Sequence, residues 1–174
     1  MSKVKAFFID RDGVINVEKE YLYKCDDFEF IDGVFDALRY LQFRGYKLFI
    51  VTNQSGINKN LYTDEDFKIL TSWMLNLLNK ESIYISGIEY CPHTIEENCN
   101  CRKPKTGMIE NIIRRFQIDL DESWLIGDKN TDIECANNAG IYNTIQVKSG
   151  HIFDEKKSIA KFIIESIKNI KDVI

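Results

Sequence analysis

The sequence predicts an α/β fold, a doubly wound and mostly parallel sheet with helices on both faces, and three observations lead to this prediction. Apolar runs of strand length alternate with amphipathic runs of helix length, which is the pattern of a parallel sheet covered by helices. Polar residues follow several of the apolar runs directly. The 174 residues, 44% of them hydrophobic, are enough for one substantial core but few for two, so we expect residues 1–174 to form one domain.

The first elements are predicted from apolar runs and from a glycine stop. Residues 4–9 form an apolar run of strand length. Residues 34–41 carry apolar side chains at helical spacing, and the helix is expected to stop at Gly45, because glycine readily adopts the positive φ that ends helices. The second strand is predicted at residues 47–51.

The next helix has a clear start. Thr63 precedes an acidic first turn at residues 64–66, which suits the positive end of the helix dipole. The buried stripe of this helix is predicted to be Phe67, Leu70, Met74, Leu77 and Leu78. A third strand is predicted at residues 88–90.

The remaining elements alternate in the same way. We predict a helix at residues 108–116, a strand at 124–126, a helix from about residue 132 to the glycine at position 140, a strand at 144–147 and a last helix over 159–170.

Charge and the N-terminal sequence exclude some classes of protein. With 23 Lys and Arg against 27 Asp and Glu, the net charge of −4 lacks the basic excess of nucleic-acid-binding domains. The first apolar run is too short for a signal peptide or a membrane span. We therefore expect a cytoplasmic, monomeric protein with reduced thiols and no nucleic-acid or membrane partner.

Polar groups are predicted to meet where the parallel strands end, because these ends lie at one edge of the sheet, where ligands bind. Asp10 and Asp12, two residues apart, follow the first strand. Paired carboxylates suit a divalent cation or a shared proton, although these two aspartates could equally serve only to form the turn after the strand. One carboxylate of the pair Asp128 and Asp132 can complete an all-oxygen magnesium site with these two aspartates, although Asp132 in particular also suits a helix start with no wider role. The residues at these ends are Asp10, Asp12, Thr52, Asn53, Cys91 and Asp128.

Two further segments suit a phosphate. The sequence VTNQSG places a hydroxyl, an amide and a glycine-loosened backbone at the end of the second strand, where an ordinary turn would use similar residues. Arg102 and Lys103 precede Pro104, and a solvated pair of cations is the alternative explanation for them.

The spacing of cysteines predicts a structural zinc site in a loop over residues 91–101. Cys91 and His93 form one close pair and Cys99 and Cys101 another, which is the ligand set of a closed tetrahedral zinc; coincidental clustering of buried cysteines is the alternative. Cys25 and Cys135 are expected to be isolated buried or half-buried side chains, and His151 a surface loop residue without an assigned role.

Four segments in this order, FFIDRDGVIN, VTNQSGI, CRKPKTGM and LIGDKNTDI, resemble the motifs of the haloacid dehalogenase-like (HAD) phosphatases. The resemblance covers roughly residues 4–147. It is closest to the D,D-heptose 1,7-bisphosphate phosphatase branch, which shares its motifs with the histidinol-phosphate phosphatases. It implies a Rossmann-like fold without a large cap domain, and it agrees with a zinc loop, although the TIEEN stretch between the cysteine pairs is short.

The resemblance also implies a role for each matching residue. Asp10 corresponds to the nucleophile and Asp12 to the acid and base, while Thr52 and Lys103 correspond to the groups that stabilise the transferring phosphoryl. Asp10, the backbone carbonyl of Asp12, and Asp128 correspond to the Mg²⁺ ligands. The substrate contacts would be Glu18, Lys19, Glu20, Tyr21, Asn53, Gln54, Ser55 and Arg102.

The function expected on these grounds is Mg²⁺-dependent removal of the 7-phosphate of D-glycero-D-manno-heptose 1,7-bisphosphate through an aspartyl-phosphate. Histidinol phosphate is the nearest alternative substrate. A phospho-receiver protein is a rival of another class, but the second acid at Asp12 suits rapid hydrolysis of an aspartyl-phosphate. A zinc-dependent adaptor is disfavoured by the net charge.

Overall fold

A computed structural model, which describes residues 3–174, contains one sheet of six parallel strands. The strands lie in the order β3-β2-β1-β4-β5-β6, so the chain winds outward from β1 in one direction and then in the other. Their bounds are β1 Val4–Ile9, β2 Lys47–Asn53, β3 Ile85–Cys91, β4 Ile118–Gly127, β5 Asn143–Val147 and β6 Phe162–Ile164. The predicted doubly wound parallel sheet is confirmed, and its direction of winding reverses between β1 and β4.

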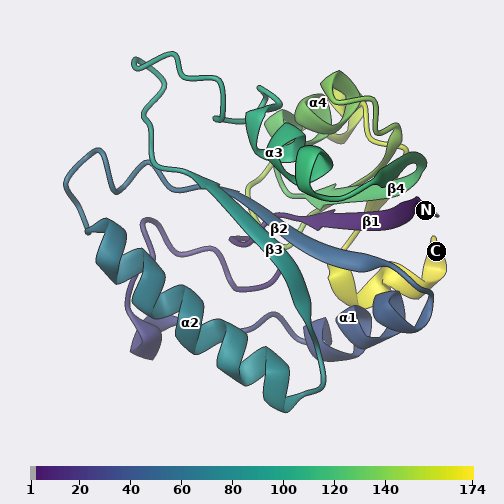
Figure 1. Cartoon of the computed structure of the whole chain (residues 1–174), viewed down its shortest axis with the longest axis horizontal. Coiled ribbons are helices and arrows are strands. Elements are labelled where there is room, and N and C mark those ends of the chain that lie inside the picture. Colours follow the sequence, from purple (N-terminus) through teal and green to yellow (C-terminus); the bar gives the residue numbers. More distant parts are fainter. Residues whose placement is uncertain (1–2) are drawn as a thin grey trace.

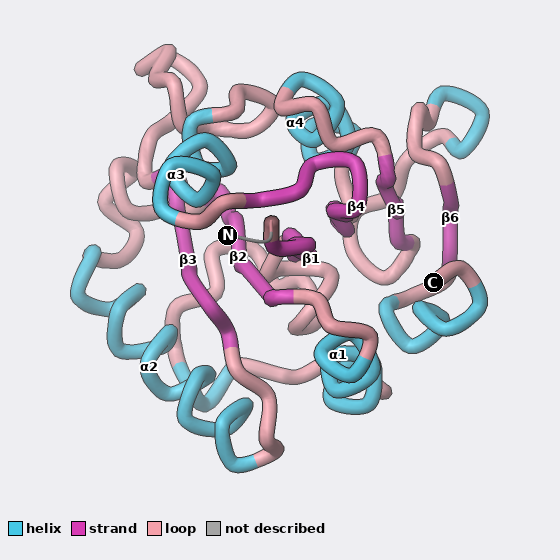
Figure 2. Tube along the Cα trace, turned by 45° about the vertical axis from the view of Figure 1, so that its right-hand side comes forward, coloured by secondary structure: helices cyan, strands magenta, loops and turns pink. Residues whose placement is uncertain are grey.

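Helices cover both faces of the sheet (Figures 1 and 2). One face carries α1 (Val34–Phe43), α2 (Asp64–Lys80) and the 3-10 helix η3 (Ile167–Asp172), whose side chains share a core with Phe7 and Ile9. The other face carries α3 (Gly107–Arg115) and α4 (Asn130–Asn138), packed on Phe8 and Phe49. Strand residues therefore alternate between two cores, as the two-residue period of a strand requires.

The helix starts follow local rules. At the start of α2, the Thr63 hydroxyl accepts a hydrogen bond from the backbone N–H of Asp66 at 3.0 Å, and the Asp66 carboxylate accepts one from the backbone N–H of Thr63 at 2.8 Å. This reciprocal cap satisfies two of the N–H groups that a helix start leaves unpaired. Helix α1 ends two residues before Gly45, which has the predicted positive φ.

The prediction of a last helix over residues 159–170 is wrong. Phe162–Ile164 is an edge strand that pairs in parallel with β5, and the 3-10 helix η3 begins only at Ile167. Ile159, an expected member of the buried stripe, is exposed. An isoleucine-rich run satisfies either period, and here pairing with the free edge of β5 determines the structure.

The connections add little separate structure. Residues 10–33, between β1 and α1, form loops and the short 3-10 helix η1 (Cys25–Asp27), and a second one, η2, spans Glu155–Lys157. Within residues 3–174, no helix combines the length and the hydropathy that crossing a membrane requires.

Candidate active site

The carboxyl ends of the central strands bring the predicted polar residues together. Asp10 follows β1 directly, Thr52 is the last residue but one of β2, and Asp128 follows β4. The backbone N–H of Asp10 donates to the carbonyl of Ile126 at 3.0 Å, which fixes Asp10 against β4 at the point where the winding reverses. All three side chains are buried.

Three buried carboxylates form the centre of this site. One oxygen from each of Asp10, Asp128 and Asp132 lies within 4.8 Å of the others. The Oδ1 atom of Asp128 is buried and has no hydrogen-bond partner, and carboxylate oxygens are the ligands that hard divalent cations prefer. The residues present therefore fit a divalent cation, and Asp132, for which the sequence allowed either a place in the cation site or only a helix start, belongs to the cluster as well.

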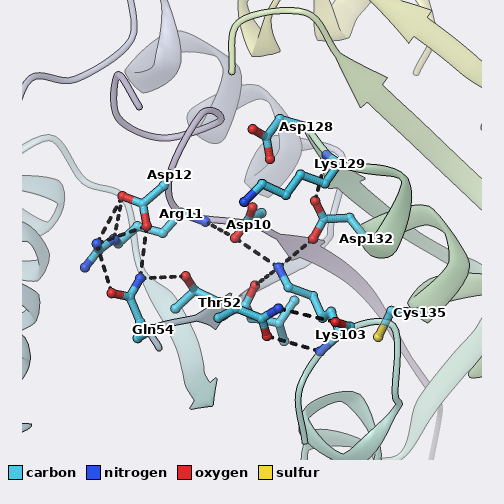
Figure 3. A network of polar contacts seen from close by, with 12 residues as sticks. Asp10, Arg11, Asp12, Thr52, Gln54, Lys103, Asp128, Lys129, Asp132 and Cys135 are labelled. Carbon is cyan, nitrogen blue, oxygen red and sulfur yellow. Dashed lines mark hydrogen bonds and ion pairs between the residues drawn. The ribbon is translucent and has the colours of Figure 1, made fainter. Parts of the chain in front are cut away.

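Lys103 is the cation that the structure places in this cluster. Its buried Nζ lies 3.0 Å from Asp10 Oδ1 and 2.5 Å from Asp132 Oδ1, and it donates to the carbonyl of Val51 at 2.9 Å (Figure 3). Burial acts to lower the pKa of Lys103, but the two carboxylates outweigh it and raise that pKa. Burial raises the pKa of Asp10 well above its ordinary value, with Lys103 opposing and the other carboxylates adding to the rise.

The carboxylate of Asp12 lies apart from this cluster. It accepts hydrogen bonds from the Arg11 guanidinium on both oxygens, from Asn16 Nδ2 at 3.0 Å and from Gln54 Nε2 at 2.9 Å. Figure 3 shows it turned toward Arg11 and Gln54 and away from Lys103. Its orientation is therefore set by three neighbouring side chains.

Gln54 connects Asp12 to the rest of the site. The same Nε2 also donates to Thr52 Oγ1 at 2.9 Å, and Oε1 accepts from the Tyr62 hydroxyl at 2.5 Å. Burial raises the pKa of Tyr62 to about 12, so the phenol stays a donor. No role is predicted from the sequence for Arg11, Asn16 or Tyr62, and only the position of Arg11, between the two aspartates of its motif, is a signal.

Asn53 fixes the loop that carries Lys103. Its Oδ1 accepts from the backbone N–H of Lys103 at 3.1 Å, and its Nδ2 donates to the Lys103 carbonyl at 3.4 Å. Asn53 was expected to contact a substrate, and this pairing shows that it also joins the end of β2 to the Lys103 loop.

A cavity of about 550 Å³ opens over the carboxylates. Asp10 and Asp12 lie in its wall, and burial, followed by the charge of Asp12, raises the pKa of Glu18 there. Six lysine and arginine side chains also line it, which suits an anionic ligand. Of the predicted contacts, those in the wall are Glu18, Lys19, Glu20, Tyr21, Asn53, Gln54, Ser55 and Arg102, and the further cations are Lys59, Lys103, Lys105 and Lys129.

The four predicted zinc ligands gather in the loop between β3 and α3, which extends beyond the sheet (Figure 1). Cys99 Sγ lies 3.5 Å from both Cys91 Sγ and Cys101 Sγ, and His93 Nδ1 lies 3.4 and 3.2 Å from Cys91 and Cys101. A tetrahedral zinc with bonds of about 2.0–2.3 Å separates its ligand atoms by about 3.3–3.8 Å. Cys91 Sγ and Cys101 Sγ lie closer together, at 2.9 Å. Three thiols and one imidazole within one cluster are the ligand chemistry of a structural zinc site, so these four residues are a candidate zinc site.

The zinc-ligand cluster also holds Arg102. The backbone N–H of Arg102 donates to Cys99 Sγ at 3.3 Å, and its Nη1 donates to the carbonyl of His93 at 3.1 Å. The other cysteines lie elsewhere, Cys135 buried and Cys25 half-buried, as expected.

His151 lies in a loop with its side chain 42% exposed, which confirms the expected surface loop position. The sequence predicted no contact for it, but its Nδ1 lies 2.7 Å from the Oδ2 of the fully buried Asp128, and the residue lines the cavity. No local pattern marks this contact, because His151 lies 23 residues from Asp128 and the segment after β5 brings it there.

Known proteins resemble this chain over nearly its whole length. The family described as HAD-hydrolase-like matches residues 100–170. D-glycero-alpha-D-manno-heptose-1,7-bisphosphate 7-phosphatase of Campylobacter jejuni is 44% identical over 172 residues, which cover 99% of this chain and 95% of the relative. D-glycero-beta-D-manno-heptose-1,7-bisphosphate 7-phosphatase of Pasteurella multocida is 40% identical, with coverage of 98% and 96%.

A solved structure agrees with these relatives. The crystal structure of D,D-heptose 1,7-bisphosphate phosphatase from B. bronchiseptica, complexed with magnesium and phosphate, superimposes with a TM-score of 0.86. It is 26% identical, and the match covers 97% of each chain.

Proposed function

Because the chain belongs to the family of D-glycero-D-manno-heptose-1,7-bisphosphate 7-phosphatases, we propose that it hydrolyses the 7-phosphate of this sugar bisphosphate. One observation carries the proposal: Asp10, Asp128, Asp132 and Lys103 form a buried cluster at the switch point of the sheet, and Asp10, Asp132 and Lys103 also line the cation-rich cavity. Phosphoryl transfer requires alignment and charge neutralisation, and this cluster can supply both.

Asp10 is the proposed nucleophile. Its Oδ1 accepts from the backbone N–H of Arg11 at 2.9 Å and pairs with Lys103 Nζ, which leaves Oδ2 for attack on phosphorus. A new bond forms between Asp10 and phosphorus while the bond from phosphorus to the sugar O7 breaks. The Lys103 ammonium favours the ionised form that this attack needs, because it opposes the rise in the pKa of Asp10.

Asp12 is the proposed acid and base. It gives its proton to O7 as the sugar leaves, then takes a proton from the water that attacks the phosphorus on Asp10. The second attack releases inorganic phosphate and restores both carboxyl groups. Fixing Asp12 through Arg11, Asn16 and Gln54 keeps the proton donor in one place during both steps.

Mg²⁺ fits the carboxylate cluster, with Asp10, the backbone carbonyl of Asp12 and Asp128 as the proposed ligands. The bound ion supplies positive charge that neutralises and orients the phosphate oxygens. The unpartnered Oδ1 of Asp128 supports this assignment.

Thr52 and the cavity residues are proposed to bind the substrate. Thr52 and Lys103 are proposed to stabilise the transferring phosphoryl. Its pocket is lined by Asn53, Gln54 and Ser55. Arg102 and the loop over residues 18–21 are proposed to contact the rest of the sugar phosphate. Zinc in the 91–101 loop orders this wall, because two atoms of the cluster residues bind Arg102 directly.

The protein is further proposed to act in the cytoplasm as a monomer with a single domain over residues 1–174. None of the five cysteines is paired in a disulfide, which suits a reducing compartment. The one continuous sheet supports the single domain.

Phosphate release measured side by side tests the proposal. The substrates are both anomers of heptose 1,7-bisphosphate and histidinol phosphate, each with Mg²⁺ and with a chelator of Mg²⁺. We expect Mg²⁺-dependent release of one phosphate from a heptose bisphosphate. Faster turnover of histidinol phosphate, or release that is independent of Mg²⁺, would contradict the proposal.

A further inference from the structure

The two oxygens of Asp128 have very different surroundings. Oδ2 accepts two hydrogen bonds from one residue, from the backbone N–H of His151 at 2.8 Å and from its Nδ1 at 2.7 Å. Oδ1 is buried and has no partner. The carboxylate is therefore held by one oxygen, and the other is left for a ligand that the protein itself does not provide.

The segment that carries His151 lies directly on Asp128. A Cβ at Gly150 would come within 2.1 Å of Asp128 Oδ2, and one at Gly13 within 2.7 Å. Only glycine allows both stretches of backbone to approach this closely. The Ser149 hydroxyl donates to the carbonyl of Gly13 at 2.7 Å, which ties the segment after β5 to the turn after β1.

We propose that His151 is a positioning residue, which holds the Asp128 carboxylate so that Oδ1 faces the cation that Asp10 and the backbone carbonyl of Asp12 also bind in the proposed function. A carboxylate can rotate about its Cβ–Cγ bond, and two donors on Oδ2 remove that freedom. The outer partners of metal ligands commonly determine affinity in this way, and their loss typically costs 10–100-fold in metal binding.

The hydrogen bond requires a proton on Nδ1 of the imidazole. Nδ1 then serves Asp128, and the role of His151 is to donate one hydrogen bond at a fixed position. This requirement suggests a discriminating pair of variants. In His151→Asn, the side-chain amide nitrogen can stand near the position of Nδ1, whereas His151→Ala removes the donor and leaves the backbone N–H in place.

Direct binding of Mn²⁺, a probe for Mg²⁺, tests this inference on the full-length zinc-loaded protein without substrate. Free Mn²⁺ is counted by electron paramagnetic resonance during a titration. We expect His151→Ala to weaken binding at least tenfold and His151→Asn to restore it to within about threefold of the unmodified protein. Ile152→Ala, a change at the fully exposed neighbouring side chain, is the matched control and should bind as the unmodified protein does.

Two outcomes would overturn the inference: unchanged Mn²⁺ affinity in His151→Ala, or an equal loss in His151→Asn and His151→Ala. Thermal unfolding of the metal-free variants shows whether each one folds, and His151→Asn provides the second test if His151→Ala does not. The inference rests on the cation site of the proposed function, but the titration contains no sugar phosphate. If His151→Ala weakens Mn²⁺ binding as expected yet the unmodified protein releases no phosphate, the proposed function fails and this inference stands.

Discussion

Replacing Lys103 by methionine should destabilise the Mg²⁺-free protein strongly near neutral pH. Methionine keeps much of the length of the side chain but removes the ammonium that lies 3.0 Å from Asp10 and 2.5 Å from Asp132. Both carboxylates are buried, so they lose their nearest compensating charge without gaining water. Removing one partner of a buried ion pair costs about 3–5 kcal/mol.

The size and the pH dependence of this effect follow from the cluster. With a urea m-value of about 2 kcal/mol/M, a loss of about 4 kcal/mol moves the unfolding midpoint down by roughly 2 M. The pKa of Asp10 is raised in the folded protein although Lys103 lowers it, so the variant should raise it further. When the pKa of a carboxyl is higher in the folded protein than in the unfolded chain, the folded state loses stability as the pH rises from the ordinary pKa, 3.8, to the folded-state pKa. The difference between the two proteins should therefore shrink when pH falls from 7.5 to 5.

Urea unfolding at pH 7.5 and pH 5, in zinc-containing buffer without Mg²⁺, measures both effects. Lys105→Met is the matched control, because Lys105 is exposed and bonds Asn98 in the loop instead of the carboxylates. Equal midpoints for Lys103→Met and the unmodified protein at pH 7.5, or a difference that grows at pH 5, would refute the electrostatic account of the cluster.

Three further predictions concern the reaction and the loop. Asp10→Asn should reduce phosphate release to background while the protein still folds, as circular dichroism would show, since an amide cannot form the covalent intermediate; near-normal release would exclude Asp10 as nucleophile. Cys99→Ala should lower both the zinc content measured by mass spectrometry and phosphate release, and full zinc occupancy would contradict the assigned site. Tyr62→Phe should slow turnover of the heptose bisphosphate about fivefold, which corresponds to the free energy of about one hydrogen bond. The same variant should leave the burst of nitrophenolate from p-nitrophenyl phosphate unchanged, because that leaving group needs no acid. Equal losses on both substrates would show that Tyr62 does not act through Gln54 on Asp12.

Much of the fold and the composition of the site could be predicted from the sequence because they depend on local patterns. The alternation of strand and helix periods predicts a parallel sheet, and such a sheet brings the ends of its strands to one edge. Asp10 and Asp128 therefore had to lie near each other once both were assigned to strand ends. The candidate zinc site could likewise be predicted because Cys91, His93, Cys99 and Cys101 all lie within eleven residues of sequence.

The contacts that could not be predicted join segments that are far apart in the sequence. Tyr62 reaches Asp12 through Gln54, across 50 residues of chain, and neither residue carries a pattern that indicates the other. The strand at Phe162–Ile164 forms because β5 offers a free edge, and an isoleucine-rich run reads equally well as a helix. The wrongly predicted helix and the unpredicted contact of His151 have one cause. Both concern the segment after β5, and the path of that segment depends on where the sheet ends.

The division between predicted and missed residues has a physical basis. Strand ends determine where a reactive group stands, but they leave its side chain free to rotate, and a group that rotates contributes little to catalysis. In this protein the orientation comes from other segments: Tyr62 acts through Gln54 on Asp12, and His151 acts on Asp128. Substitutions in those segments should therefore alter metal affinity or proton transfer without removing any group that touches the phosphate.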